Sequence, residues 1–300
     1  MTSVDSQNPE IARAVANAFL TEKSATVERA LREICESWTD APQTLRSVIE
    51  YSLFAGGKRL RPALALGAAE LVSGDDTVAI PAACALEMIH TYSLMHDDLP
   101  SMDDDDIRRG HPTAHKAFGE ANAILGGDGL LTMAFDVAAQ TGYAAVVREI
   151  AQAAGVAGMV GGQVLDLESE NKQLTLDELR QIHAYKTGAL IRVSVRVGAM
   201  LGGATSDTVD ALTRFGEAIG LAFQIADDIL DVVGLEANLG KPVGSDANKH
   251  KSTYPQLVGL EQARALAAEA RDEALGALEP FGAKADVFRA LAHFIVARDK

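Results

Sequence analysis

The sequence predicts an all-α protein, because its apolar residues recur mostly at spacings of three and four and alternating β-branched runs are scarce. This spacing places apolar side chains on one face of a helix, whereas a strand would need a spacing of two. We expect helices over residues 10–38, 41–55, 59–72, 77–99, 120–140, 143–168, 175–202, 206–233, 258–278 and 283–298. Residues 100–119 and 234–251 are expected to be long irregular stretches, which are often functional in compact domains.

Residues typical of helix ends support these limits. Thr175 precedes Asp177 and Glu178, and Ser206 precedes an acid, as expected where a helix begins. Turn-forming residues separate the helices at Gly56-Gly57, Ser73-Gly74, Gly110 to Pro112, Gly202-Gly203 and Gly240 to Gly244. Because no Pro- or Ser-rich linker divides the chain, we expect one domain over residues 1–300, with residues 1–20 a loose N-terminal segment.

Composition excludes several classes of protein. The 300 residues carry 42 acids and 27 bases, a formal charge of −15, which argues against nucleic acid as the main partner. A hydrophobic content of 48% excludes a wholly disordered acidic chain. The two cysteines cannot form a disulfide scaffold, and no apolar run reaches the roughly 18 residues of a membrane span. We expect a cytoplasmic protein without a signal peptide or membrane span.

A first cluster of aspartates ends one of the predicted apolar helices. The run DDLPSMDDDD at 97–106 places six carboxylates in ten residues, which repel one another unless cations are present. Pro100 ends regular helix, so the chain can turn and bring Asp103 back beside Asp97. The alternative is a solvated acidic loop.

A second cluster, DDILD at 227–231, lies inside an apolar helix pattern. Asp227 and Asp231 share one helix face, with Gln224 one turn earlier on the same side. Carboxylates without accompanying Cys or His favour Mg²⁺, with Mn²⁺ or Ca²⁺ as alternatives, and argue against zinc. Mg²⁺ usually completes its coordination with water and phosphate oxygens, so the two clusters together predict several ions on one phosphorylated ligand.

Basic residues occur close to both clusters. The segment GGKRLRP at 56–62 opens a helix and places Lys58 and Arg61 one turn apart, which predicts a diphosphate site without metal. Arg108 and Arg109 directly follow the first cluster, and His90 lies two helical turns before it. The triplet KTG at 186–188 interrupts another apolar helix. Each of these residues alone would usually be an ordinary surface charge.

Seven segments, in this order along the chain, resemble the trans-isoprenyl diphosphate synthases, specifically the bacterial farnesyl/geranyl diphosphate synthase branch. They are GGKRLRP (56–62), EMIHTYSLMHDDLPSMDDDDIRRG (87–110), FGEANAILGGDGLL (118–131), GGQVLD (161–166), KTG (186–188), FQIADDILD (223–231) and KSTYP (251–255). The resemblance implies an all-α bundle around a deep central cavity and a homodimer. The many Ala and Gly residues alone would favour an ordinary bundle with a solid core over one with a central cavity.

The resemblance also implies residue roles. It assigns a cluster of about three Mg²⁺ ions, with Mn²⁺ as the alternative metal, to Asp97, Asp98, Asp103, Asp227, Asp228 and Asp231. The allylic diphosphate (dimethylallyl or geranyl) would also be bound by Arg108, Lys186, Thr187, Gln224 and Lys241. Isopentenyl diphosphate would be bound by Lys58, Arg61, His90 and Arg109. The expected catalytic set is Asp97, Asp98, Asp103, Arg108, Lys186, Thr187, Gln224, Asp227, Asp228 and Lys241.

The expected reaction is Mg²⁺-dependent head-to-tail condensation, giving mainly farnesyl diphosphate. Tyr92 lies five residues before Asp97, about 7.5 Å lower along the helix axis. Together with Ser93 it is the candidate limit on product length, although Tyr92 as simple core filler is equally favoured. Geranyl or geranylgeranyl diphosphate remain alternative products. A terpene cyclase is disfavoured because the second motif is DDILD, and a silent partner subunit because both clusters are complete.

Overall fold

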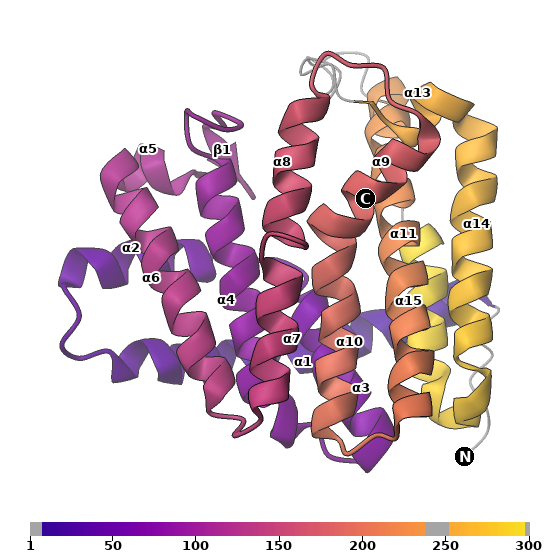
Figure 1. The fold of residues 1–300 in the computed structure, drawn as a ribbon, viewed down its shortest axis with the longest axis horizontal. Coiled ribbons are helices and arrows are strands. Elements are labelled where there is room, and N and C mark those ends of the chain that lie inside the picture. The colour runs from indigo at the N-terminus through magenta and orange to yellow at the C-terminus, as the bar shows by residue number, and fades with distance from the viewer. Residues whose placement is uncertain (1–7, 238–251, 298–300) are drawn as a thin grey trace. The chain divides into compact units, whose positions relative to one another are not determined.

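The computed structural model describes residues 8–237 and 252–297 and confirms the all-α prediction (Figure 1). Its helices are α1 (Pro9–Ser37), α2 (Gln43–Leu53), α3 (Leu60–Ser73), η1 (Thr77–Ala79), α4 (Ile80–Asp97), α5 (Ala114–Phe118), α6 (Glu120–Ala139), α7 (Ala144–Ala154), α8 (Met159–Ser169), α9 (Leu176–His183), η2 (Ala184–Gly188), α10 (Ala189–Leu201), α11 (Ser206–Ala237), α13 (Tyr254–Val258), α14 (Leu260–Ala277), η3 (Glu279–Ala285) and α15 (Asp286–Ala297). Among the described residues the only strands are β1 (Ile107–Arg108) and β2 (His111–Pro112), which pair antiparallel.

Three sequence predictions need correction. The helix expected over 143–168 is two helices, α7 and α8, because the chain breaks at 155–158, where Gly155 and Gly158 stand. The stretch 100–119 contains a small hairpin and α5. The stretch 234–251 begins as helix, since α11 continues to Ala237; the rest of it lies outside the described residues.

Other predicted limits are confirmed. The Thr175 hydroxyl accepts a hydrogen bond from the Glu178 N–H at 3.3 Å, and the Glu178 carboxylate accepts one from the Thr175 N–H at 2.8 Å. This reciprocal cap satisfies two donors that the start of α9 would otherwise leave unpaired. The interruption expected at 186–188 is the π-helical turn η2.

Contacts between Cα atoms divide the chain into two compact units. The α4 unit comprises Leu20–Glu149 and Val197–Gly203, and the α11 unit comprises Met1–Phe19, Ile150–Arg196 and Ala204–Lys300. Each unit contains one of the two aspartate motifs. The single domain over 1–300 stays a prediction.

The core of the α4 unit forms around α4, which packs against α3 and α6. Every side chain from Ala82 to Ile89 is buried, so this helix is enclosed on all sides, and Glu87 is the one charged residue in that stretch. Gly126 of α6 allows the close approach, because a Cβ there would lie 2.8 Å from both the Met95 methyl and a Val48 methyl. A larger residue at this position would require the Met95 and Val48 side chains to shift.

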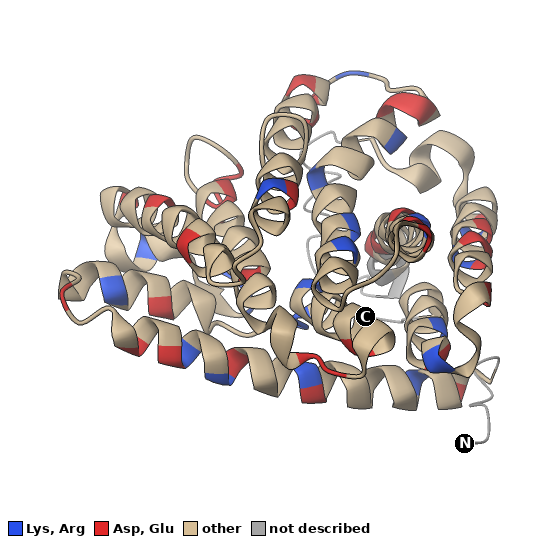
Figure 2. Ribbon diagram, turned by 60° about the horizontal axis from the view of Figure 1, so that its bottom comes forward, with Lys and Arg blue, Asp and Glu red and all other residues tan. Residues whose placement is uncertain are grey.

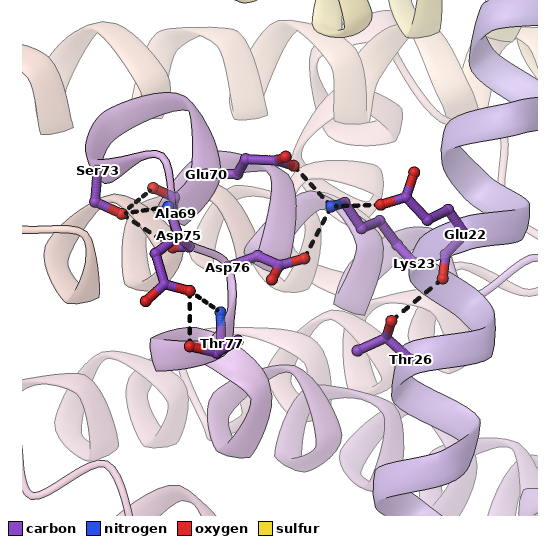
Figure 3. A network of polar contacts seen from close by, with 9 residues as sticks. All are labelled: Glu22, Lys23, Thr26, Ala69, Glu70, Ser73, Asp75, Asp76 and Thr77. Carbon is purple, nitrogen blue, oxygen red and sulfur yellow. Dashed lines mark hydrogen bonds and ion pairs between the residues drawn. The ribbon is translucent and has the colours of Figure 1, made fainter.

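A buried lysine joins α1 to the end of α3 in this unit (Figure 3). The Lys23 ammonium lies 2.7 Å from Glu70, 2.8 Å from Asp76 and 3.2 Å from Glu22, and its side chain is only 3% exposed. Burial opposes its charge, but the hydrogen bonds to the three carboxylates outweigh burial and raise the pKa of Lys23. The ammonium is therefore charged in the folded protein.

In the α11 unit, α11 packs against α14 and α15. The rings of Phe215 and Phe288 meet edge to face with centroids 5.2 Å apart, and Phe19 packs on the other side of this contact at 6.4 Å from Phe288. A second group of apolar side chains surrounds Tyr254, which is fully buried. These contacts set the positions of the helix that carries the second aspartate motif.

Two stretches, Thr77–Asp97 and Ala144–Ser169, have the length and composition of a membrane span, but the second is interrupted between α7 and α8. The first is 67% buried inside the protein, which is typical of a core helix. Figure 2 shows acidic and basic residues distributed along many of the described helices.

Candidate active site

The first aspartate motif forms a tight turn at the end of α4. The Asp103 N–H donates to the Asp97 carbonyl at 2.8 Å, and the Asp105 N–H donates to the Asp98 carbonyl at 3.2 Å. Asp104 adopts a left-handed conformation with φ of 51°. The kink predicted at Pro100 therefore does return the chain, and Asp103 lies next to Asp97 in this turn.

Asp98 is buried and held by Arg108. Both Nε and one terminal nitrogen of Arg108 lie 2.6 Å from the same oxygen of Asp98, and Arg108 lies 3.6 Å from Asp105. Burial raises the pKa of Asp98 against the opposing effect of Arg108. Asp98 is thus the internal partner of Arg108, and a second anion bound by Arg108 would have to share or replace it.

Arg109 projects from the hairpin to the Gly56-Gly57 segment. Its guanidinium donates to the Gly56 carbonyl. A Cβ at Gly57 would lie 2.8 Å from that guanidinium, and the φ of 133° at Gly57 also disfavours larger residues. The structure thus brings Arg109 to the predicted isopentenyl diphosphate segment, although these residues are 53 apart in sequence.

The other residues predicted for that site surround the same segment. Lys58 is exposed, and Arg61 and His90 are half-buried. Burial, together with the charges of Arg61 and Arg109, lowers the pKa of His90 well below its usual value. His90 is therefore neutral near pH 7 and can donate a hydrogen bond without adding charge. A small cavity of about 30 Å³ nearby is lined by Asp98, Arg108 and Arg109 among others.

The residues predicted to limit product length lie on α4. Tyr92 is buried, and its ring meets His96 edge to face at 5.7 Å. Burial and then Asp97 raise the pKa of Tyr92, so its phenol is neutral. The Ser93 hydroxyl donates to the His90 carbonyl at 2.9 Å, which fixes it on the helix surface.

In the α11 unit, Lys186 and Thr187 lie on the π-helical turn η2. Such turns shift the register of side chains and are frequent at functional sites. Lys186 pairs with Asp166 of α8 at 2.6 Å. Gly162 allows this approach, because a Cβ there would lie 2.2 Å from the Lys186 backbone nitrogen.

The second aspartate motif lies in the C-terminal third of α11. Asp227 and Gln224 are half-buried and Asp231 is exposed. Asp228 is buried and accepts a hydrogen bond from the Tyr254 N–H at 2.9 Å, so it also anchors the start of α13. Lys241 lies outside the described residues.

The donors of both motifs fit a hard divalent cation, because they are carboxylates and the tight turn of the first motif gathers them. Asp104, Asp106 and His115 also bring ligand atoms within 4.8 Å of one another. Asp106, however, already pairs with Lys116 at 2.7 Å, and its carboxylate is exposed. The assignment of metal ligands to Asp97, Asp98 and Asp103 stays a prediction, and this neighbouring group is not part of it.

Sequence reasoning missed several residues that hold the site together. Asp166 binds Lys186, and the buried pair Arg59 and Glu87 lies beneath the Gly56-Gly57 segment. A signal was present for the two acids, since each interrupts an apolar helix pattern. No local signal distinguished Arg59 from the basic residues on either side of it.

The α4 unit also contains a cavity of about 740 Å³ between the end of α1, α2 and α6. Leu45, Ile49, Leu125 and Met133 contribute to its mainly apolar lining, and none of the predicted site residues does. This cavity is separate from the aspartate motif of the same unit.

Comparison with known proteins identifies relatives over most of the chain. A farnesyl diphosphate synthase of Geobacillus stearothermophilus is 50% identical over 82% of this chain and 85% of its own. A chloroplastic geranylgeranyl pyrophosphate synthase of Capsicum annuum is 47% identical over 94% of this chain and 78% of its own. The crystal structure of a geranyltransferase from Legionella pneumophila superposes with a TM-score of 0.82 at 34% identity, covering 95% of this chain and 98% of that one. Residues 42–292 match the model of the polyprenyl synthetase family. The chain is a prenyltransferase and belongs to the polyprenyl synthetase family.

Proposed function

We propose that this enzyme condenses isopentenyl diphosphate head-to-tail with dimethylallyl or geranyl diphosphate, releases diphosphate and forms mainly farnesyl diphosphate. One observation carries the proposal: the turn after α4 returns Asp103 to Asp97, beside Asp98 and Arg108. That arrangement combines hard carboxylate donors with a cation at one place, as a metal-bound diphosphate requires.

We further propose that both aspartate motifs bind divalent cations for the allylic diphosphate. Asp97, Asp98 and Asp103 would supply the carboxylates of the first motif, and Asp227, Asp228 and Asp231 those of the second. Bound Mg²⁺, three ions per site in this proposal, would supply Lewis-acid neutralisation of the departing diphosphate. Arg108 and Lys186 would add direct cations to it, with Lys241 beyond α11, and Lys186 would first leave Asp166.

The residues of the chain guide the remaining steps. Lys58, Arg61 and Arg109 would bind the diphosphate of isopentenyl diphosphate, with neutral His90 as a hydrogen-bond donor. When the allylic C1–O bond breaks, the Thr187 hydroxyl and the Gln224 carbonyl can direct their dipoles at the positive carbon. The double bond of isopentenyl diphosphate then bonds to C1. Loss of a proton, with the departed diphosphate as base, leaves a new allylic product.

Product length is proposed to end at fifteen carbons because Tyr92 is buried below the first aspartates. The bacterial relative from Geobacillus is named for a farnesyl product, which supports this reading, whereas the plastid relative is named for a longer one. Geranylgeranyl diphosphate is therefore the second candidate product. Measuring products of the Tyr92 variant, described below, separates them.

We also propose that the enzyme is a cytoplasmic homodimer. In the α4 unit, α6 exposes Leu125 by 58% and also exposes Ile124. In the α11 unit, α8 exposes Val160 and Val164, with Val156 just before it 90% exposed. Large apolar side chains gathered on a helix face favour an interface. The buried free thiols of Cys35 and Cys84 fit a reducing compartment.

Incubation of the purified enzyme with Mg²⁺, isopentenyl diphosphate and either allylic diphosphate tests the proposal. We expect a C15 product by chromatography and loss of turnover with EDTA. No condensation, or turnover that survives EDTA, would contradict it. A cyclic hydrocarbon formed from the allylic substrate alone would instead indicate a terpene cyclase.

A further inference from the structure

The three basic side chains of the segment Lys58-Arg59-Leu60-Arg61 differ in their exposure to solvent. Lys58 is exposed and Arg61 is half-buried, whereas the Arg59 side chain is 0% exposed. Only Lys58 and Arg61 were expected to bind substrate. The buried Arg59 side chain therefore acts within the α4 unit rather than by contacting a ligand in solvent.

Arg59 is held from three directions. One terminal nitrogen donates to Glu87 of α4 at 2.5 Å, and the other donates to the Leu53 carbonyl at 2.6 Å and lies 3.5 Å from Glu28 of α1. Glu87 is itself almost fully buried, with a side chain 3% exposed. The guanidinium thus joins the end of α2, α1 and α4 directly beneath the start of α3. A buried ion pair of this geometry is costly to separate.

The backbone of this segment is unusual in the same place. Arg59 adopts a left-handed conformation with φ of 48°, and Gly56 and Gly57 also have positive φ. A non-glycine residue keeps such a conformation only where its surroundings hold it there. The contacts of its side chain supply that constraint.

We propose that the Arg59–Glu87 pair is a positioning element for isopentenyl diphosphate binding. It fixes the left-handed turn that directs Lys58 and Arg61 away from the core and presents the Gly56 carbonyl to Arg109. Glu87 also lies one turn before His90 on α4, so the same pair sets the spacing between that helix and the segment. This inference rests on the proposed function of Lys58 and Arg61.

Substitution of Glu87 by Gln separates positioning from simple electrostatics. The change removes a negative charge close to several arginines, so charge alone would tighten the binding of an anion. Positioning predicts the opposite: the KM for isopentenyl diphosphate should rise about tenfold, and the KM for geranyl diphosphate should change by less than about twofold. Titration calorimetry with isopentenyl diphosphate should show the same loss of affinity without turnover.

Arg59→Lys and Arg59→Met provide a graded series. Lysine keeps the charge but cannot span both Glu87 and the Leu53 carbonyl as the guanidinium does, so its effect should lie between wild type and Arg59→Met. Arg192→Met is the matched control, since Arg192 is an exposed arginine paired with Glu217 at 3.6 Å. If Arg59→Met fails to fold, the double variant Arg59→Met/Glu87→Leu replaces the buried ion pair by two apolar side chains. This variant should fold and should still bind isopentenyl diphosphate weakly.

The outcomes distinguish failure of the Arg59–Glu87 inference from failure of the proposed function. A folded Glu87→Gln enzyme with unchanged or tighter binding of isopentenyl diphosphate overturns the inference alone. An equal rise of both KM values does the same, because it indicates a general structural role. A wild-type chain that neither condenses nor binds isopentenyl diphosphate overturns the proposed function itself.

Discussion

The N–H of Asp103 donates a hydrogen bond to the carbonyl oxygen of Asp97 at 2.8 Å. This single backbone bond closes the turn that follows α4, so two carboxylates six positions apart in sequence belong to one loop. Pro100 ends the helix and makes the turn possible. The turn therefore lets the proposed metal site draw on both Asp97 and Asp103, although Pro100 interrupts the helix between them.

Removal of the Asp103 carboxylate should affect catalysis far more than folding. Asp103→Asn keeps the backbone bond, and its loss of a metal-binding oxygen should lower kcat by about a hundredfold or more. Steady-state kinetics over a series of Mg²⁺ concentrations measures this. Asp106→Asn is the control, because Asp106 is exposed and paired with Lys116; equal losses in both variants would contradict a specific role for Asp103.

Lys23→Met should destabilise the protein by about 2–4 kcal/mol, because it leaves Glu70 and Asp76 close together without their buried cation. Urea unfolding measures the difference. Lys116→Met removes an exposed ion pair, which solvent already screens, and should cost far less than Lys23→Met. If Lys23→Met is no more destabilising than Lys116→Met, the network of Figure 3 is not a stabilising one.

His183 should make the stability of the protein depend on pH. Burial lowers its pKa from 6.5 to about 4, and its ring packs against Tyr254 with centroids 5.5 Å apart. Below pH 6.5 the unfolded chain binds a proton that the folded chain excludes, so stability falls as the pH drops from 6.5 towards 4. At pH 5 the loss is on the order of 2 kcal/mol.

His183→Phe should remove this component. Unfolding free energies at pH 7 and pH 5 should differ less in the variant than in wild type. His111→Gln serves as the control, because His111 is exposed on the hairpin. The same pH slope in wild type and His183→Phe would show that His183 does not titrate as the structure indicates.

Tyr92→Ala should lengthen the product. The buried phenol ring is removed from α4, and the space it leaves would admit additional five-carbon units. Chromatography of the products should show C20 or longer chains where wild type gives C15. Tyr143→Ala, at an exposed position, should leave the length unchanged. An unchanged C15 product from Tyr92→Ala would identify Tyr92 as core filler.

Leu125→Asp should weaken the proposed dimer, because it places a charge on the exposed apolar face of α6. Sedimentation velocity at micromolar concentration should show a shift from dimer to monomer. Ile107→Asp is the control, because it also replaces an exposed apolar side chain by a carboxylate, but on the hairpin. A wild-type protein that sediments as a monomer, or a variant that remains dimeric, would contradict this interface.

Local sequence signals predicted most of the helices and the residues of the first motif. Apolar spacing identifies the buried face of a helix, and Pro100 and the Thr175 cap identify where helices stop or begin. These signals failed at the break near Gly155, because a short irregular turn between two helices preserves the apolar pattern. They also failed to show the hairpin that carries Arg108 and Arg109, since strands of two residues leave no period to recognise.

The class of fold, the two aspartate motifs and the basic segment at 56–62 can be recognised from the amino-acid sequence, because each depends on residues close together in the chain. The internal partners of these side chains come from distant parts of the chain and are visible only in the folded protein. Arg59 turns inward to Glu87, Asp98 accepts a hydrogen bond from Arg108, and Asp228 accepts one from the N–H of Tyr254. Residue spacing specifies a face of a helix but not the group that covers it, and a buried charge lies where a partner from another helix can offset its loss of water.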